Sequence, residues 1–124
     1  MIIEKHIRPA AIKKGPVKGA RDKSDFVDSE KYRNCIKSCN EKISRNHRDE
    51  LAYIERGDAQ LYLDNSKEAL NDYRRAIEIN PNSIKAYYGM AAVHTMLGLH
   101  KNALYELIKA MELEQQLEEK TAET

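Results

Sequence analysis

The sequence predicts an all-α protein, a short right-handed α-solenoid of about five helices arranged as antiparallel pairs. A pattern of small and aromatic residues recurs at a step of 34 residues in the C-terminal half, and a fixed period of this size is typical of stacked repeats. Apolar residues recur at spacings of three and four, as they do on one face of a helix. Charged residues make up 33% of the chain and its mean hydropathy is -0.74, which favours well-solvated helices.

The repeated positions carry small or aromatic residues in most places. They are Tyr53 and Tyr87, Gly57 and Ala91, Ala69 and Ala103, Tyr73 and Leu107, and Ala76 and Ala110. Each pair is separated by the same 34 residues.

Residues 1–28 are predicted to form a basic, disordered tail. Two prolines and two glycines between residues 9 and 19 interrupt any helical period. Residues 1–25 carry seven basic side chains against three acidic ones. Such a composition buries too little apolar surface to offset the entropy lost on ordering. Residues 29–124 are predicted to form the helical domain.

The first predicted helix, over residues 29–45, begins at Ser29 as its N-cap. Its apolar residues lie on one face: Tyr32, Cys35, Ile36, Cys39 and Ile43. Asn46 is a candidate cap for the second helix. Asn65 and Glu68 have the spacing of a capping box that opens the third helix, and Pro81 ends that helix.

The fourth predicted helix begins after Ser83 and continues to about Leu97, where Gly98 supplies the left-handed residue that ends it. The fifth is predicted from about His100 to near Glu119. Residues 111–124 carry five glutamates against one lysine, so the chain has a basic beginning and an acidic end.

The segment AYIERGDAQLYLDNSKEALNDYRRAIEINP, which ends at Pro81, resembles a tetratricopeptide repeat. In this family the small Gly57 is expected to let paired helices approach, with Ala69 facing it, and Tyr73 to lie between successive repeats. The resemblance implies full repeats at 50–81 and 84–115, a half repeat at 29–45 and an acidic end at 116–124.

The family resemblance implies a non-catalytic protein–protein interaction module, a small adaptor or scaffold that binds a peptide in a concave groove. The first helix of each pair would line this groove, with Leu51, Ile54, Glu55, Asp58, Tyr62, Lys85, Tyr88, Gly89, Ala92 and Thr95. The alternative is a structural assembly subunit that self-associates through an uncapped C-terminal helix. Its candidate contacts are Leu104, Leu107, Ile108 and Met111.

The expected partner is a protein or peptide of basic or amphipathic character. One branch of the family clamps the acidic tails of heat-shock chaperones, and Lys85 matches one clamp lysine. Glu55 and Gly89 stand where that branch has Asn and Arg, and Glu55 would repel a carboxylate. Binding of a chaperone tail is therefore not expected.

No enzyme activity, cofactor or metal is predicted, because no phosphate-binding loop, zinc motif or nucleophile motif occurs. Cys35 and Cys39 lie one helical turn apart. They either fill a helix-packing position or take part in metal or redox chemistry, which would need two further ligands for zinc. His94 is expected in the core as a packed or hydrogen-bonded imidazole.

Nucleic-acid binding is not expected, because the basic segment lacks aromatic residues between its lysines. No stretch is apolar enough for a membrane span or a secretory signal, which favours a cytoplasmic protein. A homo-oligomer remains open.

Overall fold

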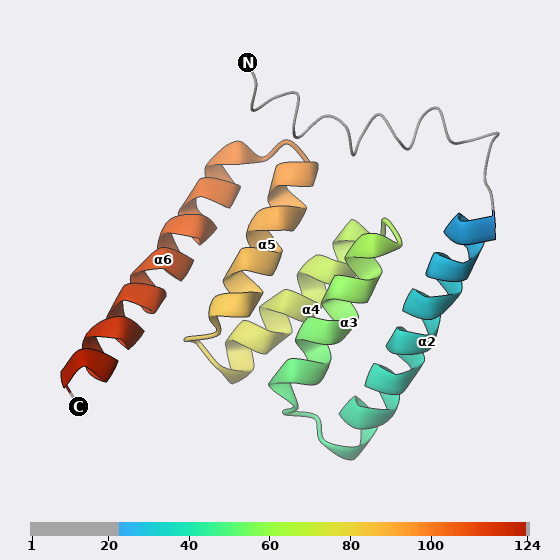
Figure 1. Ribbon diagram of the computed structural model, residues 1–124, viewed down its shortest axis with the longest axis horizontal. Coiled ribbons are helices and arrows are strands. Elements are labelled where there is room, and N and C mark those ends of the chain that lie inside the picture. The colour runs from blue at the N-terminus through green and yellow to red at the C-terminus, as the bar shows by residue number, and fades with distance from the viewer. Residues whose placement is uncertain (1–22, 124) are drawn as a thin grey trace. The chain divides into compact units, whose positions relative to one another are not determined.

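A computed structural model describes residues 23–123 (Figure 1). The chain divides into two compact units, residues 1–30 and 31–124. The described part of the first unit is the N-terminal end of one helix. The contacts discussed below lie within the second unit.

The described residues form five α-helices and no strand, which confirms the all-α prediction. They are α2 (Lys23–Arg45), α3 (Glu50–Tyr62), α4 (Ser66–Ile79), α5 (Ile84–Met96) and α6 (His100–Glu123). No helix among residues 23–123 is long and apolar enough to cross a membrane.

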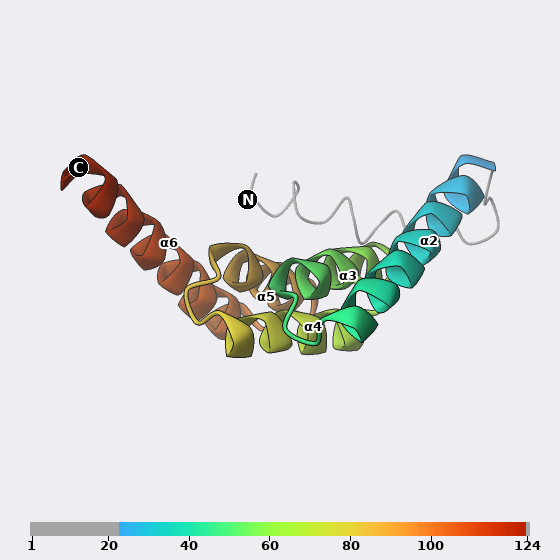
Figure 2. The same cartoon turned by 90° about the horizontal axis from the view of Figure 1, so that it is seen from below.

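The helices α3 to α6 form two antiparallel pairs. Helix α3 packs against α4, α5 packs against α6, and α4 packs against α5. Helix α3 also contacts α5 directly, so the first helices of both pairs are neighbours. Figure 2 shows α3 and α5 on the same side of α4. A helix pair with a 34-residue step therefore stacks on the next pair as the period predicts.

Helix α2 begins earlier than predicted. It starts at Lys23, so Ser29 lies inside the helix and is not its N-cap. The prediction of a disordered tail is wrong for residues 23–28, and for residues 1–22 it lies outside the described residues. Pro9, Gly15, Pro16 and Gly19 all lie before Lys23, which leaves the polar residues after them free to extend the helix.

Of the caps predicted for the second and third helices, Asn46 is wrong, whereas Asn65 does occupy the N-cap position but without a capping bond. Helix α3 is capped by Asp49, whose Oδ1 accepts from the Ala52 amide at 3.1 Å. Asn46 instead accepts a hydrogen bond from the Arg48 amide within the preceding turn. Asn65 does precede α4, but its side chain makes no capping bond and donates to Gln60 Oε1 at 2.7 Å. The capping box with Glu68 is therefore not formed.

The other predicted helix ends agree with the structure. Helix α4 ends at Ile79, two residues before Pro81, and Gly98 has a φ of 77° in the turn between α5 and α6. Ser83 flanks α5 as predicted, although its side chain makes no capping bond. Helix α6 extends four residues beyond the predicted end at Glu119.

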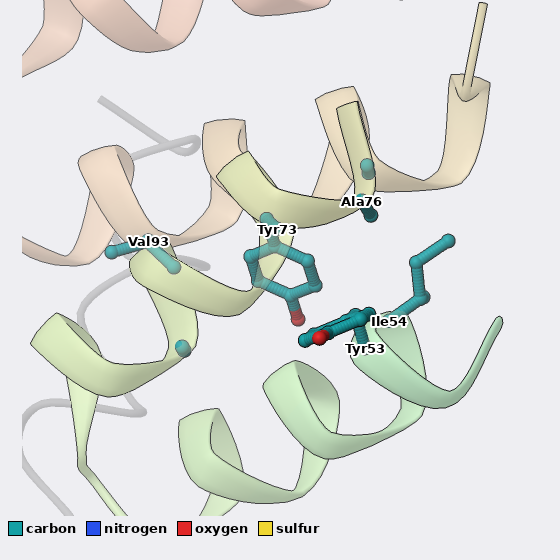
Figure 3. Packing of buried hydrophobic residues seen from close by; sticks show 7 residues of the cluster. Tyr53, Ile54, Tyr73, Ala76 and Val93 are labelled. Atoms are coloured by element: carbon teal, nitrogen blue, oxygen red, sulfur yellow. The ribbon is translucent and has the colours of Figure 1, made fainter. Parts of the chain in front are cut away.

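The core is centred on Tyr73, which is fully buried. Figure 3 shows its ring directed from α4 towards Tyr53 on α3, with Val93 of α5 also in the cluster. A Cβ added to Gly57 would lie 2.9 Å from the Tyr73 ring, and one added to Gly89 would lie 2.5 Å from it. The ring therefore fits between two helices that lack side chains there, as expected for a residue between repeats.

The contact identifies the side chain that occupies the space beside Gly57. The small residue was expected to face Ala69, but the atoms nearest to its missing side chain belong to Tyr73. Ala69 is itself fully buried. The glycine makes room for an aromatic ring, and the aromatic ring fills the space between successive helix pairs.

Two buried acids lie at equivalent positions of the two helix pairs. Asp72 of α4 accepts two hydrogen bonds from Arg56, at 3.0 Å from Nε and 2.7 Å from Nη2. Glu106 of α6, 34 residues later, lies 2.7 Å from His94 Nδ1. Both carboxylates are buried and paired, as buried charges require. His94 is the hydrogen-bonded core imidazole that the sequence predicted.

Candidate functional site

The exposed sides of α3 and α5 form the candidate binding surface, called the α3–α5 face below. It contains the predicted groove residues that are accessible: Leu51, Glu55, Asp58, Tyr62, Lys85, Tyr88, Ala92 and Thr95. Most of these side chains are exposed, and Ala92 and Thr95 are half-buried. Helices α3 and α5 contact each other directly, so the listed residues of α3 lie next to those of α5.

Ile54 does not belong to this surface. The sequence placed it among the groove residues, but its side chain is only 5% exposed and packs in the core cluster with Tyr53 and Tyr73. One turn of α3 therefore has an apolar residue on each side, with Leu51 outside and Ile54 inside. Helical spacing alone does not separate them, since they are three residues apart.

Gly89 is the second departure from the predicted groove. The position is half-buried, and the space for a side chain is taken by the Tyr73 ring. The backbone of α5 therefore lies directly against a core aromatic beneath the face.

Glu55 forms an ion pair with Lys42 of α2, with Lys42 Nζ 3.3 Å from Glu55 Oε1. This hydrogen bond raises the pKa of Lys42. Both side chains are about half exposed, so water and salt weaken the pair. An incoming cation can therefore compete with Lys42 for this carboxylate at small cost.

Asp58 has both a surface and a core role. Its Oδ1 accepts a hydrogen bond from the Tyr73 hydroxyl, while the residue as a whole is exposed. Burial of the ring, followed by the bond to Asp58, raises the pKa of Tyr73. The tyrosine therefore stays protonated and donates, and one Asp58 oxygen remains available at the surface.

The aromatic residues of the face are held by neighbouring helices. The ring of Tyr62 stacks on Tyr32 of α2, with ring centroids 4.6 Å apart and planes 6° apart. The Tyr88 hydroxyl donates to Glu114 of α6 at 2.8 Å. Sequence reasoning missed Lys42, Tyr32 and Glu114, because each contact joins residues of different helices and no periodic signal marks it.

The two cysteines are one turn apart on α2, with Cys39 buried and Cys35 half-buried. Burial, followed by the proximity of Cys35, raises the pKa of Cys39 to about 12. A neutral thiol is a poor nucleophile and a poor metal ligand. Within residues 23–123 no group of three or more His, Cys, Asp or Glu residues is arranged to hold a metal ion.

Helix α6 carries a second surface feature. The predicted self-association residues Leu104, Leu107, Ile108 and Met111 are all exposed. Leu113, on the opposite side of the helix, is buried. The exposure agrees with the sequence prediction, and self-association itself stays a prediction.

The groups of the α3–α5 face are of the kinds that bind a peptide. The His94–Glu106 pair is buried in the core and does not belong to this face. The α3–α5 face offers carboxylates, aromatic rings and an aliphatic side chain on two adjoining helices. Such a surface can hold an extended or helical peptide.

The chain is similar in sequence to one repeat family and to several known proteins. A family model described as TPR repeat matches residues 51–98. Hsp70-Hsp90 organizing protein 2 of Arabidopsis thaliana is 30% identical over 89 residues, which are 72% of this chain and 16% of that protein. Human serine/threonine-protein phosphatase 5 is 34% identical over 87 residues, or 68% of this chain and 17% of that protein.

Among solved structures, the complex of the TPR2B domain of yeast Sti1 with pHsp70 superposes with a TM-score of 0.70 at 26% identity. The match covers 77% of each chain, and it supports the predicted solenoid of paired helices. The chain spans about one sixth of the length of the relatives named above.

Proposed function

Because the chain belongs to the tetratricopeptide repeat family, we propose that it is a non-catalytic adaptor that binds a peptide segment of a partner protein. The binding surface is the α3–α5 face. The observation that supports this proposal is the direct contact between α3 and α5, the two helices on which Glu55, Asp58 and Tyr88 are exposed. The Tyr73 ring fills the space beside Gly57 and Gly89 beneath these two helices.

The charges of the α3–α5 face favour a basic or amphipathic peptide. Glu55 and Asp58 lie one turn apart on α3 and are both exposed, while Lys85 is the only basic residue of the face on α5. Leu51, Tyr62 and Tyr88 supply apolar area between the charges. A peptide that alternates lysine with leucine would satisfy both kinds of contact.

An acidic peptide is the competing partner, since the similar Sti1 domain is in complex with pHsp70. Lys85 alone would attract a carboxylate here. Glu55 opposes it, and the position of Gly89 has no room for a basic side chain beside Tyr73. The basic peptide is therefore the better fit, and a cytoplasmic location remains the prediction that goes with it.

The test compares two synthetic peptides of equal length that share their leucines and differ by lysine or glutamate at the polar positions. The protein carries Glu55→Gln with Asp58→Asn, which removes two charges but keeps an acceptor for the Tyr73 hydroxyl. The control carries Glu41→Gln with Glu68→Gln, two exposed acids outside the face. Binding is measured by fluorescence anisotropy.

We expect the lysine peptide to bind the native protein and the face variant to lose about 5- to 30-fold in affinity, as two surface ion pairs allow. The control should bind like the native protein. Tighter binding of the glutamate peptide would overturn the preference for a basic partner. Equal binding by all three proteins would overturn the assignment of the α3–α5 face.

A further inference from the structure

The exposed side of α6 bears an apolar stripe, defined as Leu104, Leu107, Ile108 and Met111. The spacings of three and four place these residues on one face of the helix. Leu104 is 59% exposed and Met111 is 60% exposed. The opposite side of α6 holds buried Ala103, Glu106, Ala110 and Leu113, and α6 packs against α5.

The repeat indicates what kind of surface this stripe is. Leu70, Tyr73 and Ile77 occupy the positions of α4 that lie 34 residues before Leu104, Leu107 and Met111. On α4 these three side chains belong to the core or pack against it, and α5 contacts this helix. The same positions on α6 meet no helix among residues 23–123. The stripe therefore has the pattern of a surface that receives another helix.

We propose that the stripe binds the α6 stripe of a second copy of this chain, with the two helices antiparallel. This interface goes beyond peptide binding and uses a different surface from the α3–α5 face. An isologous contact of this kind closes after two copies, because each stripe covers the other.

Charge complementarity selects the antiparallel direction. The exposed lysine near the start of α6 is Lys101, while the later turns carry the exposed glutamates Glu112, Glu114, Glu118 and Glu119, which outnumber the single exposed Lys120. Two parallel copies would place like charges side by side. Antiparallel copies place the basic end of each helix beside the acidic end of the other.

The two-fold axis then lies near Leu107 and Ile108, the middle of the stripe. Leu104 of one copy faces Met111 of the second copy, and Lys101 lies level with Glu114 of the second copy. Another way of covering the stripe fits less well. A head-to-tail contact would set the apolar stripe against the exposed side chains of α2, which include Lys31, Arg33, Asn34, Lys37 and Glu41.

Sedimentation velocity of the full chain, from low to high micromolar concentration, tests the proposal. The native chain should pass from monomer to dimer, and Leu107→Glu should weaken the dimer by at least about 100-fold, as expected for a central interface residue. Tyr105→Glu is the matched control. Tyr105 is an exposed aromatic on the same helix, one residue away from Leu104 and off the stripe.

A charge pair tests the direction of the helices. The variant Leu104→Glu with Met111→Lys places opposite charges across the antiparallel interface and should still dimerise. The variant Leu104→Glu with Met111→Glu places like charges there and should remain monomeric. Circular dichroism checks that both variants keep their helices, which is expected since the substituted side chains are exposed.

A native chain that stays monomeric throughout, or a Leu107→Glu variant that associates like the native chain, would overturn the proposed interface. Equal behaviour of the two charge-pair variants would overturn the antiparallel direction. The Glu55→Gln, Asp58→Asn variant should dimerise normally, so failure of peptide binding and failure of dimerisation can be told apart.

Discussion

Helices α4 and α6 present the same repeat positions in different surroundings. On α4, Leu70, Tyr73 and Ile77 face the core, and α5 packs against this helix. On α6 the residues 34 positions later are exposed apolar side chains. A periodic sequence therefore specifies an apolar face, and whether that face becomes core depends on the next helix in the stack.

The residue in the middle of each face also differs in its surroundings. Tyr73 on α4 fits into the space left by Gly57 and Gly89 on two other helices. Leu107 on α6 has no such pocket among the described residues and is 37% exposed. The aromatic ring joins two helix pairs in one core, while the leucine leaves a surface open for association.

The largest expected effect is the loss of stability on truncating the buried Tyr73. Truncation of the exposed Leu107 is the comparison. Tyr73→Ala should lower the free energy of unfolding by about 3–5 kcal/mol, because it empties a fully buried aromatic site. Leu107→Ala should change it by no more than about 0.5 kcal/mol, as at other exposed positions. Urea unfolding at low protein concentration, where the monomer dominates, measures both. Similar losses for the two variants would contradict the contrast between a covered and an open face.

The glycine beside the ring should show a smaller effect. Gly89→Ala forces the Tyr73 ring to shift, at a cost of about 1–3 kcal/mol, and regains about 1 kcal/mol of helix propensity. The net result is a loss of stability. Adding Tyr73→Leu, which copies the residue at this position of α6, should make Gly89→Ala neutral or stabilising. A double-mutant cycle with no coupling between the two sites would contradict the proposed fit.

The smallest effect concerns the hydroxyl of Tyr73. Asp58→Ala removes its acceptor and should cost about 1 kcal/mol in the free energy of unfolding. Asp58→Asn keeps an oxygen acceptor and should cost less. Thermal melts of the two variants, each also made with Tyr73→Phe, provide the check. If Asp58→Ala lowers stability equally with and without Tyr73→Phe, the hydrogen bond between Tyr73 and Asp58 contributes nothing to stability.

Some of the candidate site followed from local spacing and some did not. The resemblance to the tetratricopeptide family implied that Glu55, Asp58 and Tyr88 would line an accessible groove. It placed Ile54 on the same surface, because a residue three positions away lies on a neighbouring part of the helix. Burial of Ile54 depends on the Tyr73 ring and its neighbours in the core, which come from other helices.

Local sequence likewise predicted some of the helix ends and not others. Pro81 and Gly98 act through their own backbone geometry, so their effects could be predicted from the residue alone. Asn46 and Asn65 were expected to cap helices, but their side chains bond to the Arg48 amide and to Gln60. A polar side chain near a helix start has several partners within reach, and the fold of the turn selects one of them.

The sequence by itself determined the paired helices, the 34-residue step, the apolar faces and the position of His94 in the core. The helices, the step and the apolar faces follow from residue type and period, which act within one helix or between adjacent repeats, and the position of His94 follows from the resemblance to the tetratricopeptide family. Only the tertiary structure decided that Tyr73 lies against Gly89, that Lys42 pairs with Glu55, and that Arg56 and His94 serve two equivalent buried acids. These contacts join side chains from different helices, and their geometry is set by how the helices pack.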